Sequence, residues 1–165
     1  KLAAKASGFS INLSGNSLND DHFLEFLLGQ FEVSSVPPEM ICFEITETAA
    51  ITNLSDATEF IRVLKRAGCK FALDDFGSGL SSYAYIQKLP VDFIKIDAEG
   101  HDTNIIKGML DWLDIIEKKP YILFEGEWYD DLENQTANML SERYQHNISR
   151  IGRDIMMVPK PNKFI

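Results

Sequence analysis

The feature that most constrains the fold is a regular alternation of short apolar runs with helical patterns. The runs are rich in β-branched and aromatic residues, and the segments between them space apolar residues as an amphipathic helix does. The predicted strands are 9–13, 40–45, 70–74, 92–97 and 121–125, and the predicted helices are 19–31, 55–67, 81–88, 103–118 and 130–144. Strands joined through helices pair in parallel by right-handed crossovers, so the alternation predicts an α/β fold.

The end of the chain follows a different pattern. Residues 147–150 and 154–158 flank Ile-Gly-Arg, which is typical of an antiparallel hairpin. The 165 residues fit a single α/β domain, whereas a closed eight-stranded barrel needs about 200–250 residues. We therefore expect an open, mostly parallel sheet that ends in an antiparallel hairpin.

Charge and hydropathy exclude several classes of partner. A net charge of −9 argues against nucleic acid and against an anionic membrane, because both attract Lys and Arg. No apolar run approaches the roughly 20 residues of a membrane span, and no signal peptide is visible. Cys42 and Cys69 have neither a disulfide framework nor metal-ligand spacing, which predicts buried, reduced thiols in a cytoplasmic protein.

Polar residues stand at the carboxyl ends of successive predicted strands, where parallel α/β folds bind their ligands. These residues are Asn12, Glu44, Asp74 with Asp75, and Lys95. Any one of them could be solvated or cap a helix, but a full set at successive strand ends favours a site. Carboxylate and amide oxygens prefer Mg²⁺ or Mn²⁺ to zinc. Asp74 and Asp75 could bridge two ions about 4 Å apart for an in-line attack on phosphorus, and Lys95 could orient the attacking water or hold a phosphate oxygen.

Four stretches, in this order and spacing, resemble the EAL-type cyclic-di-GMP phosphodiesterases. They are Asn-Leu-Ser at 12–14, Glu-Ile-Thr-Glu-Thr at 44–48, Asp-Asp-Phe-Gly-Ser-Gly at 74–79 and Val-Asp-Phe-Ile-Lys-Ile-Asp at 91–97. The resemblance covers residues 1–97. It implies that cyclic-di-GMP is the ligand.

The same resemblance assigns a role to each matching residue. It implies that Asn12, Glu44, Asp74 and Asp75 bind metal and that Asp75 and Lys95 are catalytic. It also implies that Glu47 organises the loop over residues 76–80. The family's Glu-x-Leu strand should precede Asn-Leu-Ser, but only eight residues precede Phe9, and nothing after Lys95 fits the Glu and Gln that complete the family's site.

The second half of the sequence resembles a different family. Lys-Ile-Asp-Ala-Glu-Gly at 95–100, Lys-Gly at 107–108, the strand at 119–125 and Gly-Arg-Asp-Ile at 152–155 are similar to FkbM-type S-adenosylmethionine methyltransferases. This likeness covers residues 94–158 and would place Asp97 and Glu99 near the cofactor. These methyltransferases bind S-adenosylmethionine with a glycine-rich loop, and the only candidate for it is the motif at 74–79. Because that motif already belongs to the EAL pattern, we do not expect this cofactor.

Our main hypothesis from the sequence is therefore a chimera, either natural or engineered. In it, a partial barrel (1–97) continues into a Rossmann-like half (98–165), giving a scaffold without a complete active site that retains Mg²⁺ or Mn²⁺ binding. The first alternative is a metal-dependent cyclic-di-GMP phosphodiesterase or a degenerate cyclic-di-GMP binder. The second is a methyltransferase-like cofactor binder. An unclosed apolar sheet edge favours self-association as a homodimer.

Overall fold

The structure, a computed structural model, describes residues 8–77, 85–98, 100–125, 131–144, 146–151 and 154–160. The chain divides into two compact units, which we describe separately. The N-terminal unit comprises residues 1–74 and 84–91, and the C-terminal unit comprises residues 75–83 and 92–165. None of the helices in the described ranges has both the length and the apolar character needed to cross a membrane.

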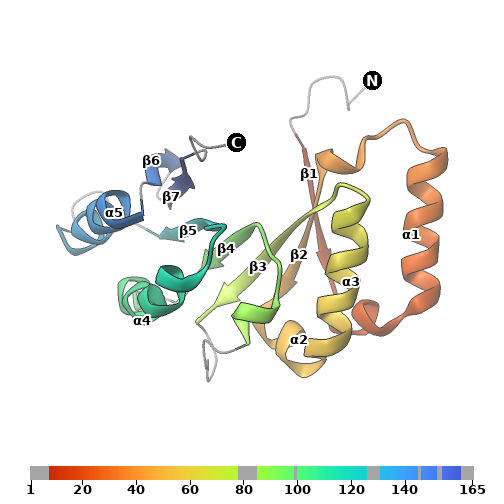
Figure 1. Cartoon of the computed structure of the whole chain (residues 1–165), viewed down its shortest axis with the longest axis horizontal. Coiled ribbons are helices and arrows are strands. Elements are labelled where there is room, and N and C mark those ends of the chain that lie inside the picture. The colour runs from red at the N-terminus through yellow and green to blue at the C-terminus, as the bar shows by residue number, and fades with distance from the viewer. Residues whose placement is uncertain are drawn as a thin grey trace. The chain divides into compact units, whose positions relative to one another are not determined.

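The N-terminal unit is built on parallel strands, with helices lying along one side of them (Figure 1). Its strands are β1 (Phe9–Leu13), β2 (Ile41–Thr46) and β3 (Lys70–Phe76), with β2 in the middle. Its helices are α1 (Asp21–Val33), α2 (Glu47–Thr52) and α3 (Leu54–Arg66), with 3-10 turns η1 (Gly15–Asn19), η2 (Pro38–Met40) and η3 (Ile86–Lys88). The parallel pairing predicted from the alternation is confirmed. Part of the predicted helix 81–88 lies outside the described residues.

Local signals set the ends of these helices. The Asp20 side chain accepts a hydrogen bond from the Phe23 N–H at 3.1 Å and caps the start of α1. The Thr46 hydroxyl does the same for α2 through the Ala49 N–H at 3.3 Å. After α3 the chain reverses at Gly68, whose φ of 110° lies in the left-handed region that favours glycine. These signals explain where α1 and α2 begin and where α3 ends.

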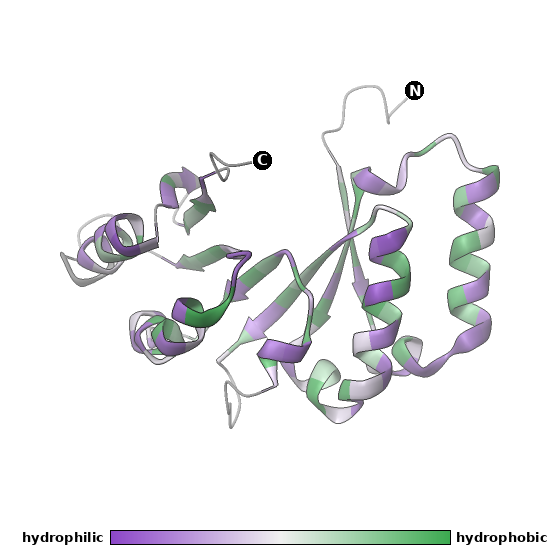
Figure 2. Cartoon of the chain, viewed as in Figure 1, coloured by the Kyte–Doolittle hydropathy of each residue, from purple (hydrophilic) through white to green (hydrophobic). Residues whose placement is uncertain are grey.

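The core of the N-terminal unit lies between its strands and α3. Strands β2 and β3 bury one face, which includes Phe43 and Phe71, whose rings are 5.5 Å apart. Phe60 of α3 meets Phe71 edge to face at 6.5 Å. Figure 2 shows that hydrophobic and hydrophilic residues follow one another along α3. Their helical spacing gathers the buried residues on one side of the helix. Because strand side chains alternate, the residues between the buried ones project from the opposite face.

The two cysteines of this unit are free thiols in different surroundings. Cys42 is half-buried rather than fully buried as expected, whereas Cys69 is buried. Burial raises the pKa of the Cys69 thiol to about 11, and the nearby Glu39 carboxylate adds to this effect. The thiolate is the reactive form, so the folded protein should protect Cys69 from thiol reagents.

We therefore expect a Cys42→Ser variant to react with a disulfide reagent at about pH 8 only as fast as the chain unfolds. Absorbance of the released thiol would follow the reaction with and without urea. The matched Cys69→Ser variant should react in the folded state. Rapid labelling of Cys69 in folded protein would contradict the prediction.

The C-terminal unit combines parallel and antiparallel pairing. Strand β4 (Phe93–Ile96) pairs in parallel with β5 (Tyr121–Glu125). Strand β7 (Asp154–Pro159) runs antiparallel to β5 and to β6 (His146–Ile151), which confirms the predicted hairpin. Its helices are α4 (Asp102–Ile115) and α5 (Asp131–Tyr144). Across both units the strand pairing is mostly parallel, as predicted.

One face of these strands forms the core of the C-terminal unit. Register partners on β4, β5 and β7 are buried in rows, for example Ile94 beside Ile122 and Ile122 beside Met157. Helix α4 contributes Ile106 and Met109, which are also fully buried. Lys95 alternates with the buried residues of β4 and therefore projects from the other face of the strand.

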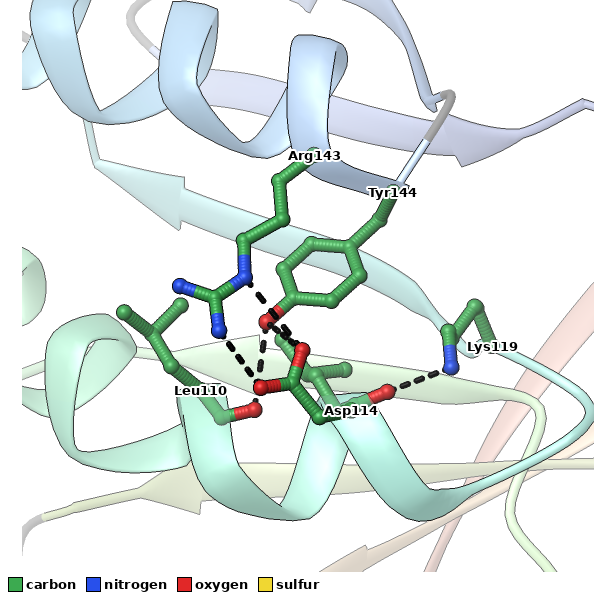
Figure 3. A network of polar contacts seen from close by, with 6 residues as sticks. Leu110, Asp114, Lys119, Arg143 and Tyr144 are labelled. Carbon is green, nitrogen blue, oxygen red and sulfur yellow. Dashed lines mark hydrogen bonds and ion pairs between the residues drawn. The ribbon is translucent and has the colours of Figure 1, made fainter.

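A polar cluster ties the C-terminal ends of α4 and α5 together (Figure 3). Asp114 forms an ion pair with Arg143 at 2.5 Å, and the Tyr144 hydroxyl lies 2.9 Å from the same carboxylate. Hydrogen bonds from Arg143 and Tyr144 lower the pKa of Asp114, while burial and the Asp114 carboxylate raise the pKa of Tyr144 to about 12. Lys119 donates to the carbonyls of Leu113 and Ile116 at the end of α4. These contacts join the last turns of the two helices, and Lys119 satisfies carbonyls at the end of α4.

Candidate metal site at the strand ends

Three of the predicted metal ligands share one face of the N-terminal unit. Asn12 on β1 and Glu44 on β2 are register partners. Asp74 on β3 pairs with Thr46, two residues beyond Glu44 on β2. Because side chains two residues apart project from the same face of a strand, all three lie on the face opposite the apolar core.

The surroundings of these three residues suit a hard cation. Asn12 is exposed, and Glu44 and Asp74 are half-buried, so ions in solvent can reach them. Two carboxylates and one amide oxygen are the donors that Mg²⁺ and Mn²⁺ prefer. Within the described ranges, no three His, Cys, Asp or Glu side chains gather closely enough to hold a metal by themselves. A site here would therefore depend on the amide oxygen of Asn12 as well as on the two carboxylates.

The fourth predicted ligand, Asp75, has an unusual backbone. Its φ of 54° is left-handed, although it lies within β3 and is not glycine. Asp tolerates this conformation better than most residues because its short polar side chain can bond locally. The Asp75 side chain is exposed, and the next residue, Phe76, is fully buried. Such left-handed residues recur at functional sites, but the metal-binding role expected for Asp75 stays a prediction.

The glycine that follows has a steric reason. Gly77 has a φ of 94°, and a Cβ atom placed on it would overlap the Cδ1 atom of Ile105 on α4. Glycine is therefore required here both by the backbone and by the close approach of α4. The next residues of the motif, 78 and 79, lie outside the described residues.

Lys95 lies near the carboxyl end of β4, as the sequence predicted. It is half-buried and pairs with Leu123 of β5, on the face opposite the buried Ile94 and Ile96. Asp97 directly follows the strand and is exposed. Glu99 lies outside the described residues. Lys95 and Asp75 belong to the C-terminal unit, so each is placed here only within that unit.

Glu47 is the first residue of α2 and is almost completely buried, with 1% of its surface exposed. Its carboxylate accepts a hydrogen bond of 2.6 Å from the Tyr85 hydroxyl. A buried carboxylate needs such a donor, but neither the burial of Glu47 nor its pairing with Tyr85 has a signature in the sequence. Of the loop that Glu47 was expected to organise, 78–80 lie outside the described residues. Its role there stays a prediction.

Sequence reasoning missed Asp102, the first residue of α4. It is 4% exposed, and its two carboxylate oxygens accept the backbone N–H groups of Ala98 and Glu125, each at 3.0 Å. One side chain thus joins the segment after β4 to the last residue of β5. An Asp two residues after Gly100 was a signal for the start of a helix, but the two bonding partners of Asp102 had no signal in the sequence.

Comparison with known proteins identifies relatives of the chain. The family described as EAL domain matches residues 1–105. The cyclic di-GMP phosphodiesterase PdeB of Shewanella oneidensis is 51% identical over 110 residues, which cover 62% of this chain and 13% of that protein. This chain thus spans a small part of that relative.

Two solved structures extend the likeness. The FimX EAL domain from Pseudomonas aeruginosa bound to c-di-GMP gives a TM-score of 0.63 at 25% identity and covers 86% of this chain and 59% of its own. The Klebsiella pneumoniae BlrP1 complex with manganese and cy-diGMP gives a TM-score of 0.61 at 26% identity and covers 82% of this chain and 36% of its own. Their overlap with this chain reaches well past its first 105 residues.

These findings correct the main hypothesis from the sequence. The EAL match extends beyond residue 97 into α4, and the structural likeness covers most of the chain, so the hypothesis of a chimeric scaffold without an active site was wrong. The FkbM-type segment and the Rossmann-like half are not supported either. The physical reason is that a strand ending in Asp and followed by a helix recurs in many α/β folds. The short Ile-Asp-x-Glu-Gly motif therefore could not identify one family.

Proposed function

The chain belongs to the EAL domain family, and from this we propose that it contributes the metal-binding strand ends of a cyclic-di-GMP phosphodiesterase. The observation that carries the proposal is the placement of Asn12, Glu44 and Asp74 on one face of adjacent parallel strands. PdeB, which shares half of the aligned residues, is a phosphodiesterase of this substrate, and FimX was solved with the same dinucleotide bound.

In this proposal Asn12, Glu44, Asp74 and Asp75 hold Mg²⁺ or Mn²⁺. The donors fit because they are hard oxygens, and manganese occurs in the BlrP1 complex. A divalent ion in such a site lowers the pKa of a bound water and stabilises charge on phosphoryl oxygens. The backbone of Asp75 turns at the end of β3, so two adjacent carboxylates need not follow the ordinary alternation of a strand.

The other two proposed site residues, Lys95 and Glu47, act on the substrate and on neighbouring residues of the same chain. Lys95 is a cation on a mostly apolar strand, and we assign it to hold a phosphate oxygen or to orient the attacking water. We assign Glu47 to organise the loop over residues 76–80, and its hydrogen bond from Tyr85 supports this role because it holds the carboxylate in place. Both roles rely on a side chain held in place by surrounding packing.

The proposal is tested by following hydrolysis of cyclic-di-GMP to the linear dinucleotide with the full-length protein. We expect turnover with Mg²⁺ or Mn²⁺, loss of turnover when a chelator removes the ion, and recovery when excess ion is restored. Product would be separated and quantified by chromatography. If the protein binds the dinucleotide but does not hydrolyse it in a metal-dependent way, it is a cyclic-di-GMP binder and not a phosphodiesterase. If it neither binds nor hydrolyses the dinucleotide, both functions are contradicted.

A further inference from the structure

We infer that Ser10 is a positioning residue that sets the orientation of the Glu44 carboxylate in the metal site. The inference rests on the proposed function, because it concerns a ligand of that site. Its basis is a hydrogen bond in which the Ser10 hydroxyl donates to Oε1 of Glu44. The two residues are 34 positions apart in the sequence and meet only because β1 and β2 pair.

The strand register explains why Ser10 can reach Glu44. On β1, Ser10 and Asn12 are two residues apart and project from the same face. Asn12 pairs with Glu44, and Ser10 pairs with Cys42, so Ser10 lies diagonally across from Glu44. Ser10, Asn12 and Glu44 therefore lie on one face, where the serine contacts one carboxylate oxygen and Asn12 is the register partner of Glu44.

A carboxylate on a flexible side chain benefits from such a contact. Glu44 has several rotatable bonds and is only half-buried, so packing alone does not fix its carboxylate. A donor on Oε1 restrains the group and still leaves lone pairs on both oxygens for a cation. Hydrogen bonds to ligating carboxylates are outer-shell contacts whose loss typically weakens metal binding by 10–100-fold.

The inference distinguishes Ser10 from an ordinary surface serine. A serine that merely solvates β1 would affect neither metal affinity nor the behaviour of Glu44. A positioning serine acts through Glu44 alone, so its contribution should disappear when Glu44 can no longer bind the ion. This coupling is the property to measure.

The experiment titrates Mn²⁺ into the full-length protein and detects free ion by electron paramagnetic resonance. We expect Ser10→Ala to raise the Kd roughly tenfold, whereas Ser10→Thr, which keeps the hydroxyl, should stay within about threefold of the unaltered protein. Ser35→Ala, an exposed serine before β2, is the matched control and should leave the Kd unchanged.

A double-mutant cycle with Glu44→Gln completes the test. In the Glu44→Gln background, Ser10→Ala should have no further effect on Mn²⁺ binding. Unchanged affinity in Ser10→Ala, or additive effects of the two substitutions, would overturn the inference while leaving the proposed function intact. Absence of saturable Mn²⁺ binding in the unaltered protein would overturn the proposed metal site itself, and the inference with it.

Discussion

Replacing Asp102 with alanine is expected to lower the free energy of unfolding of the C-terminal unit by about 3–5 kcal/mol. The carboxylate is buried and accepts two backbone N–H groups, from Ala98 and Glu125, each at 3.0 Å. Hydrogen bonds to an ionised group are stronger than neutral ones, and the substitution leaves both N–H groups without this acceptor. Two such losses at one residue explain the large expected effect.

Urea denaturation would measure the change in the free energy of unfolding, with tryptophan fluorescence as the signal. Trp112 is buried and belongs to the same helix as Asp102, so its fluorescence reports on this helix. Asp102→Asn keeps one acceptor oxygen and should have an intermediate effect. Asp111→Ala removes an exposed acid of the same helix and serves as the control. A loss in Asp102→Ala no larger than in this control would show that the two hydrogen bonds contribute little.

Replacing Asp74 with asparagine is expected to reduce the proposed metal-dependent turnover of cyclic-di-GMP by roughly a hundredfold or more. Loss of an outer-shell partner already weakens metal sites by about 10–100-fold, and Asp74 is proposed as a direct ligand. Asparagine keeps the size of the side chain and one oxygen donor but removes the negative charge that attracts a divalent ion. The fold of β3 should therefore survive while metal affinity falls.

Initial rates over a range of Mn²⁺ concentrations would separate weaker metal binding from a slower reaction at saturation. Asp56→Asn makes the same chemical change at an exposed position of α3 and should retain full activity. Circular dichroism would verify that both variants fold. Activity of Asp74→Asn within about threefold of the unaltered protein, at limiting and saturating metal alike, would remove Asp74 from the ligand set.

Much of the fold was predictable because its signals are local. The strand predicted over 9–13 matches β1 residue for residue, and the helix predicted over 55–67 differs from α3 by one position at each end. The first helix begins later than its apolar pattern suggested, because residues 15–19 form a 3-10 turn that buries Leu18. The third strand continues to Phe76, although Asp75 within it adopts a left-handed conformation. Such backbone detail has no signature in hydropathy.

The contacts between distant parts of the chain were not predictable. Tyr85 donates to Glu47 across 38 positions, and Asp102 bonds a residue 23 positions away, so both depend on the tertiary fold. The candidate ligands were found because parallel strands present their ends together, a general rule that needs no contact map. The single domain, the cytoplasmic location and the homodimer stay predictions.

The backbone at the end of β3 affects what a match to this motif means. Left-handed conformations at Asp75 and Gly77, with Ile105 against the second, limit both positions to very few residues whatever they bind. A protein that had lost the reaction would still need Gly77 to fold, whereas glycine or asparagine could adopt the same backbone at position 75. The motif therefore reports the shape of the chain as much as its chemistry, and activity must be judged from residues without such a backbone duty, such as Asn12 and Glu44.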